Sequence, residues 1–151
     1  MKIMAGKQAF MANEETYPIY QEDQNMINQI GQIMLYVNNQ DQAKAFWSEK
    51  AGFHIKSEED NGHMRWVEIA PTAEAETRMI LHDKELIAKM SPELNLGTPS
   101  IMFFSDRFDE LYEKLSSEGV TVGEIVQMGP QRVFNFADDE DNYFAVMDHK
   151  Q

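Results

Sequence analysis

The apolar positions of this chain form the same succession of short runs twice. Residues 33–36 (IMLY) are matched by residues 101–104 (IMFF), and residues 79–81 (MIL) by residues 145–147 (AVM). Short runs rich in branched and aromatic side chains are typical of strands. The pattern therefore predicts two copies of one structural unit, in which residue 80 corresponds to residue 146.

Each copy has the pattern of a strand, a helix and three further strands. Asn39 can cap the first helix, and Gly52 and Gly119 can end the two helices. We expect strands at 27–37, 53–58, 63–69 and 77–81 with a helix at 40–51, then strands at 100–104, 121–128, 131–137 and 143–148 with a helix at 108–118. The predicted class is α+β, with two βαβββ modules (about 27–83 and 100–149) forming a curved mixed sheet around a cleft. A connector at 84–99 joins the modules.

The composition narrows the possible partners. The 151 residues carry a net charge of −13, which disfavours binding to nucleic acid or to an anionic membrane. No apolar stretch is long enough to span a bilayer. The chain has no cysteine, which excludes disulfides and thiolate chemistry and fits a cytoplasmic protein.

The first 25 residues differ from the rest. They are polar, become acidic after Ala12, and lack the apolar centre of a signal peptide. Met26 directly precedes the first strand pattern. We therefore predict an N-terminal extension over residues 1–25, either dispensable or not native to the protein, and one domain over residues 26–151.

Two segments resemble a known superfamily. Residues 33–53 (IMLYVNNQDQAKAFWSEKAGF) resemble the opening of vicinal oxygen chelate proteins, and residues 133–148 (VFNFADDEDNYFAVMD) resemble their final hairpin. This superfamily includes glyoxalase I, extradiol dioxygenases and bleomycin-resistance proteins. The resemblance implies their paired βαβββ fold and leaves the activity open, because one scaffold supports many chemistries.

The resemblance also implies where metal ligands would stand. Carried onto this chain, the four positions fall at Gln32, Ile80, Ser100 and Val146. An amide, a hydroxyl and two hydrocarbons do not hold a transition-metal ion, so we expect no metal and no cofactor. A shift of two residues along the last strands would instead offer His82 and Asp148. Glu68 with His82 is a further candidate, as an acid–base pair.

The predicted cleft is mainly apolar and aromatic, which suits binding of an organic molecule. Eleven methionines favour a broad range of ligands. The predicted ligand-binding residues are Gln32, Met34, Tyr36, Ile80, His82, Ser100, Met102, Phe104, Phe144 and Val146.

These observations predict a metal-independent small-molecule binding protein of the glyoxalase/bleomycin-resistance type. By resemblance it is a homodimer, and no catalytic residue is assigned. Two alternatives remain open. One is an enzyme of the same superfamily, either a metal-dependent lyase or dioxygenase with an atypical site or a metal-free isomerase. The other is a structural or regulatory module whose cleft is filled by its own side chains.

Overall fold

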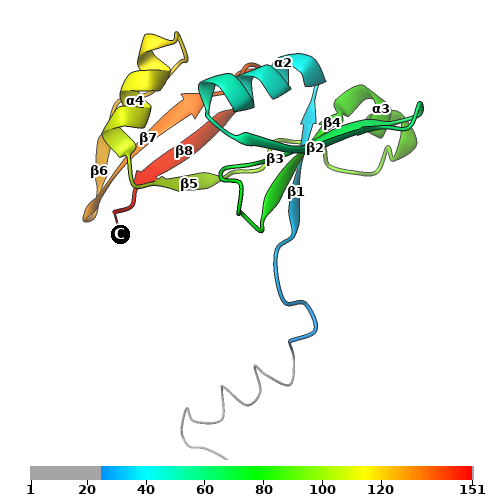
Figure 1. Cartoon of the computed structure of the whole chain (residues 1–151), viewed down its shortest axis with the longest axis horizontal. Coiled ribbons are helices and arrows are strands. Elements are labelled where there is room, and N and C mark those ends of the chain that lie inside the picture. The colour runs from blue at the N-terminus through cyan, green and yellow to red at the C-terminus, as the bar shows by residue number, and fades with distance from the viewer. Residues whose placement is uncertain (1–24, 151) are drawn as a thin grey trace, which may run out of the picture. The chain divides into compact units, whose positions relative to one another are not determined.

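The computed structural model describes residues 25–150, so most of the predicted N-terminal extension lies outside the described residues. The contacts within the chain divide it at Gly31, where a compact body begins. The helices and strands of this body, which contains both predicted modules, are shown in Figure 1. They are β1 (Gln32–Val37), α2 (Gln40–Ala45), η2 (Phe46–Lys50), β2 (His54–Asp60), β3 (Arg65–Ala70), β4 (Arg78–Asp83), α3 (Lys84–Met90), β5 (Met102–Ser105), α4 (Phe108–Ser117), β6 (Val126–Met128), β7 (Gln131–Ala137) and β8 (Tyr143–Asp148). None of the described helices is both long and apolar enough to cross a membrane.

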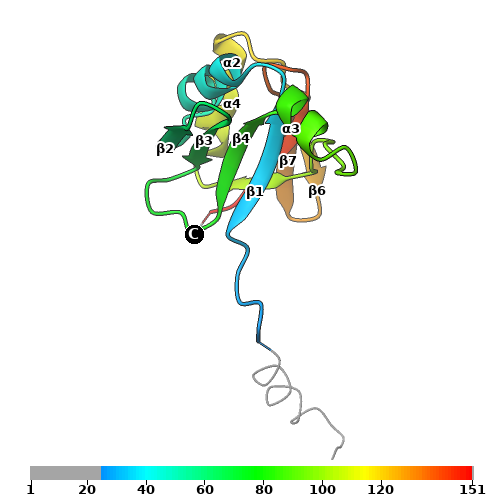
Figure 2. The same ribbon diagram turned by 90° about the vertical axis from the view of Figure 1, so that its right-hand side faces the viewer.

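The strands form two four-stranded sheets with the same internal order. The first sheet is ordered β1-β4-β3-β2 and the second β5-β8-β7-β6. In each sheet the opening strand of the module runs parallel to its closing strand, and the other neighbours are antiparallel. The repeated βαβββ unit and the α+β class are thus confirmed. Helices α2 and α4 lie on the same side of the sheets in both views (Figures 1 and 2).

The first helix begins and ends where the sequence predicts. The Asn39 side chain accepts a hydrogen bond from the Gln42 amide at 2.9 Å, and α2 starts at the next residue. From Phe46 to Lys50 the helix widens into the π-helical turn η2, which buries the consecutive residues Phe46 and Trp47. Gly52 follows with φ of 78°, a conformation that glycine adopts without steric cost.

One strand of the second module is shorter than predicted. The sequence suggests a strand at 121–128, but β6 covers only Val126–Met128, and Val122 makes an isolated bridge to Phe136. Between them the Gly123 amide bonds to the Asn135 carbonyl at 2.8 Å, and the Gly123 carbonyl accepts the Tyr112 hydroxyl at 3.1 Å. Residues 121–123 therefore stay hydrogen-bonded to β7 and also contact α4 through Tyr112, and the strand is interrupted before Val126. Alternation along the chain does not reveal this interruption.

The acidic turn between β7 and β8 joins the two modules. The Asp138 carboxylate accepts the amides of Glu140 and Asn142, each at 2.9 Å, and this fixes the turn. The Glu140 carboxylate then accepts the backbone amides of Asn38 at 2.8 Å and Asn39 at 3.0 Å. A carboxylate at this position also opposes the positive end of helix α2. The turn of one module therefore caps the helix of the other.

Both modules share one aromatic core centred on Trp47. The Trp47 side chain is fully buried, and its ring lies 4.9 Å from Phe53 of its own module. Its distances to the rings of the second module are 5.1 Å to Phe144, 6.0 Å to Phe103 and 6.1 Å to Phe136. The first helix is thus held by both modules, which fixes the sheets relative to each other.

Candidate binding face and interunit cleft

One face of the first sheet brings together residues from three neighbouring strands. Tyr36 on β1 and Trp66 on β3 both lie opposite His82 on the central strand β4. Cross-strand partners point to the same face, so the alternate residues of these strands share it. We call this surface the first-sheet face, and it comprises Gln32, Met34, Tyr36, Trp66, Glu68, Arg78, Ile80 and His82. Apolar residues on the opposite side of these strands, such as Leu35 and Leu81, are buried in the core.

The prediction that Gln32, Met34, Tyr36, Ile80 and His82 share one face is confirmed by this register. Their binding of a ligand stays a prediction. Trp66 was missed by the sequence reasoning. Trp66 could have been found only by knowing that its strand pairs with the strand of His82. The alternation within a strand does not reveal which strand it pairs with.

One end of the first-sheet face is polar. The Glu68 carboxylate accepts the Ser57 hydroxyl at 3.0 Å and lies 3.4 Å from the Arg78 guanidinium. Arg78 also donates to the Ala75 carbonyl at 3.3 Å. The Glu68 carboxylate is thus bound to Arg78 and Ser57 and is not paired with His82. The structure gives no support to the Glu68–His82 acid–base pair.

The other end is aromatic. The rings of Tyr36 and His82 are stacked with centroids 5.9 Å apart. The Nδ1 atom of His82 is buried and has no hydrogen-bond partner in the described structure. Burial lowers the pKa of His82, because a charged imidazolium would lose its hydration there. This end of the face therefore presents neutral rings at neutral pH.

Acidification is expected to destabilise the fold through His82. The unfolded chain, with an ordinary histidine pKa of 6.5, binds more protons than the folded chain between that pH and the lowered pKa. The stability contributed by neutral His82 is present above pH 6.5 and is lost as the pH falls through this window. His82→Phe keeps a ring against Tyr36 and should flatten the dependence of unfolding free energy on pH. Urea denaturation between about pH 5 and pH 8 measures this slope, and an unchanged slope would contradict the assignment.

The residues at the metal positions that the resemblance implies do not fit a metal ion. Gln32 offers an amide, and Ile80 is a buried hydrocarbon on the same face. Across residues 25–150, no three histidine or acidic side chains are grouped closely enough to hold a metal. The donor chemistry of a vicinal oxygen chelate site is therefore not present at these positions.

The second module corrects the predicted register by one residue. Met102 pairs with Ala145 and Phe104 with Met147, so Ala145 occupies the place that Ile80 has in the first sheet. Phe144 and Val146 point to the opposite face and are buried in the shared core. The expectation that they share a face with Met102 and Phe104 is wrong, because a shift of one residue reverses the face. Ser100 precedes β5 and belongs to no strand.

His82 and Asp148, the alternative pair of metal ligands, do not occupy corresponding positions in the two modules. Met147, which lies opposite Phe104, corresponds to His82, which lies opposite Tyr36. Asp148 instead accepts from the Arg132 guanidinium at 2.8 Å, and Arg132 also binds Asp109 of α4. The Asp148 carboxylate therefore anchors β7 and β8 to the helix.

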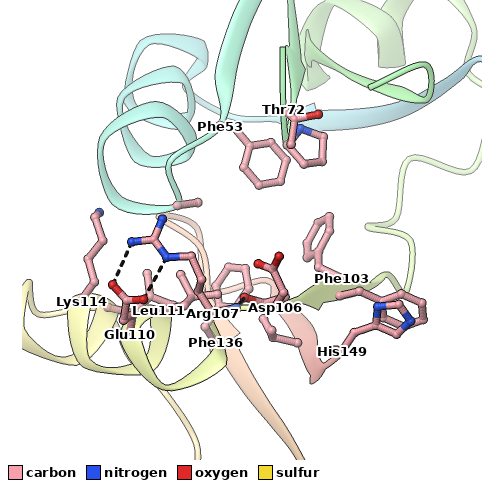
Figure 3. A pocket seen from close by; sticks show the side chains of 16 residues that line it. Phe53, Thr72, Phe103, Asp106, Arg107, Glu110, Leu111, Lys114, Phe136 and His149 are labelled. Atoms are coloured by element: carbon pink, nitrogen blue, oxygen red, sulfur yellow. Dashed lines mark hydrogen bonds and ion pairs between the residues drawn. The ribbon is translucent and has the colours of Figure 1, made fainter. Parts of the chain in front are cut away.

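A separate cleft of about 880 Å³ lies between the modules (Figure 3). Phe53 and Thr72 of the first module stand on one side, and Leu111 and Lys114 of α4 stand on the other. Of the predicted ligand-binding residues, Phe104 and Val146 line this cleft. No residue of the first-sheet face lines it, so the predicted set is divided between different surfaces. We call this cavity the interunit cleft.

The amino-acid sequence matches the sequence profile of one protein superfamily and a relative from a bacterium. The sequence profile of the Glyoxalase/Bleomycin resistance protein/Dioxygenase superfamily matches residues 29–146. The uncharacterized protein YetH of Bacillus subtilis (strain 168) is 37% identical over 123 residues, which cover 80% of this chain and 98% of YetH.

Solved structures share the fold. The crystal structure of UcmS2 is 28% identical, covers 82% of this chain and 100% of its own, and superposes with a TM-score of 0.68. TnmS3, an antibiotic binding protein from Streptomyces sp. CB03234, is 24% identical with a TM-score of 0.68, covering 80% of this chain and 95% of its own. The likeness to TnmS3 establishes the fold.

Proposed function

Since this chain belongs to the Glyoxalase/Bleomycin resistance protein/Dioxygenase superfamily, we propose that it binds a small apolar or aromatic molecule without a metal ion and without transforming it. The ligand lies on the first-sheet face. The observation that carries this proposal is the row of neutral rings, Tyr36, His82 and Trp66, across three adjacent strands. Flat rings with a few polar groups beside them are typical of sites for organic ligands.

The composition of the face supports binding over metal chemistry. Superfamily enzymes that use a metal need several imidazole or carboxylate donors around it, and here His82 is flanked by aromatic partners while Glu68 is bound to Arg78. The Glu68–Arg78 pair can orient a polar group of the ligand at the other end of the face. TnmS3 is an antibiotic binding protein with this fold. The proposal that this chain binds a small molecule depends on the side chains of its own first-sheet face.

The second wall of the site is supplied by a homodimer. Met102 and Phe104 occupy the positions in the second sheet that Met34 and Tyr36 occupy in the first, yet they are 42% and 61% exposed. The first sheet of the same chain therefore does not cover them. Burying such an apolar face against the first-sheet face of a second copy encloses a ligand from both sides. We place this dimer in the cytoplasm, in line with the absence of cysteine.

Metal content and ligand binding test the function together. Elemental analysis of the purified protein should give a metal-to-chain ratio near zero, and thermal-shift screening of aromatic compounds should give saturable stabilisation. Met34→Ala should weaken binding of the selected compound roughly tenfold by removing apolar contact. Met90→Ala, at an exposed methionine of α3, is the matched control and should leave the affinity unchanged.

The opposite results separate the alternatives. A ratio near one metal per chain, lost together with turnover in His82→Ala, would establish the metal-dependent lyase or dioxygenase. A protein that no compound stabilises would be the structural module. Equal losses in Met34→Ala and Met90→Ala would remove the ligand from the first-sheet face.

A further inference from the structure

The interunit cleft differs from the first-sheet face in both position and lining. It lies on the side of the second sheet that faces α4, and its wall is built from residues of both modules (Figure 3). The rings of Phe53 and Phe103 are 5.5 Å apart and nearly perpendicular, and the ring of Phe136 is stacked on that of Phe103 at 6.4 Å. A cavity of about 880 Å³ with aromatic walls is large enough for a drug-sized molecule.

The charged side chains at the mouth of the cleft are nearly all paired. Arg107 donates two hydrogen bonds to Glu110, at 2.9 and 2.8 Å. The Lys114 ammonium donates to the backbone carbonyls of Glu49 at 2.8 Å and Lys50 at 2.6 Å. These groups have their partners within the protein and need none from a ligand.

Asp106 is the exception. Its carboxylate makes no hydrogen bond and no ion pair among residues 25–150, although its charge attracts the neighbouring Arg107, whose guanidinium is hydrogen-bonded to Glu110. In Figure 3 it is directed into the cleft, between Phe103 and Arg107 and toward Phe53. A carboxylate that has no hydrogen-bonded partner and lies beside aromatic rings favours a cation, both through charge and through interaction of the cation with the ring faces. The net charge of −13 acts in the same direction.

We propose that the interunit cleft is a second binding site, for an aromatic amine in its cationic form. The ring system lies among Phe53, Phe103 and Phe136, and the ammonium group contacts the Asp106 carboxylate. This site goes beyond the proposed function, because it uses none of the residues of the first-sheet face.

Three probes with one ring system test the proposal by isothermal titration calorimetry on the full chain. Naphthylmethylamine should bind about fivefold more tightly than naphthylmethanol, and naphthoate should bind most weakly. Asp106→Asn should remove the preference for the amine over the alcohol. Glu113→Gln, which removes an exposed carboxylate of α4 that does not line the cleft, should retain that preference.

Blocking the cleft supplies an independent measurement. Thr72→Trp places a large ring at the exposed mouth and should weaken all three probes at least about tenfold, whereas Ala73→Trp in the same loop should not. Equal affinity for the three probes, or a preference that survives Asp106→Asn, would overturn the proposal. Binding lost in Met34→Ala but kept in Thr72→Trp would overturn it too, and would leave the proposed function of the first-sheet face intact.

Discussion

Replacing Trp47 with alanine is expected to lower the free energy of unfolding by about 3–5 kcal/mol. The Trp47 side chain is fully buried and its ring contacts aromatic rings of both modules. Deleting it leaves a cavity in the core that both modules share. A loss of this size is comparable to the whole stability of a small domain, so we expect Trp47→Ala to be largely unfolded at 37 °C.

A conservative variant separates packing from the rest of the effect. The Trp47 Nε1 atom is buried without a hydrogen-bond partner. Trp47→Phe removes this unpaired donor and keeps most of the ring contact, so its cost should be no more than about half that of Trp47→Ala. Urea denaturation followed by circular dichroism gives both free energies. Equal losses in the two variants, or a loss below about 1 kcal/mol for alanine, would show that Trp47 does not join the modules.

Much of the fold could be predicted because local signals and repetition agreed. Asn39 caps α2 as its sequence position suggests, and Gly52 and Gly119 follow the two helices with positive φ. Strands β7 and β8 have the predicted limits. Each of these features depends on residues close in sequence, for which the conformational preferences of single side chains are decisive.

The closing strands show why the site could be predicted only in part. In β4, residues 79–81 are all buried, and in β8 the apolar residues occupy both faces, so the pattern does not alternate. Without alternation, the sequence does not distinguish Ala145 from Val146 as the partner of Ile80. The opening strands β1 and β5 did carry a clear repeat, and their face was predicted correctly.

The interunit cleft could not be predicted at all. Its walls come from Phe53 and Thr72 in the first module and from Asp106 and α4 in the second. Their proximity depends on how the modules pack around Trp47, which is a property of the whole core. Single residues such as Asp106 carry no local signal, because an exposed aspartate before a helix is ordinary in any sequence.

Converting the aromatic row of the first-sheet face into imidazoles is expected to create a metal site. Tyr36 and Trp66 flank His82 on adjacent strands and the same face. Neighbouring strands lie about 4.8 Å apart, so the double variant Tyr36→His/Trp66→His aligns three imidazoles, a ligand set that zinc accepts. We expect this variant to bind zinc on the order of a hundredfold more tightly than the parent chain, as measured by competition with a chromophoric chelator.

The same double variant tests whether the parent chain lacks a metal site only because it lacks donor atoms. If the face has a suitable shape and lacks only donor atoms, zinc affinity should rise while binding of aromatic ligands is lost with the two rings. Adding His82→Gln to the double variant removes the central imidazole and separates the remaining two by the width of a strand, so zinc affinity should fall back toward that of the parent. Failure of the double variant to bind zinc would mean that the register or the shape of this face, and not its donor chemistry, sets it apart from metal-dependent relatives.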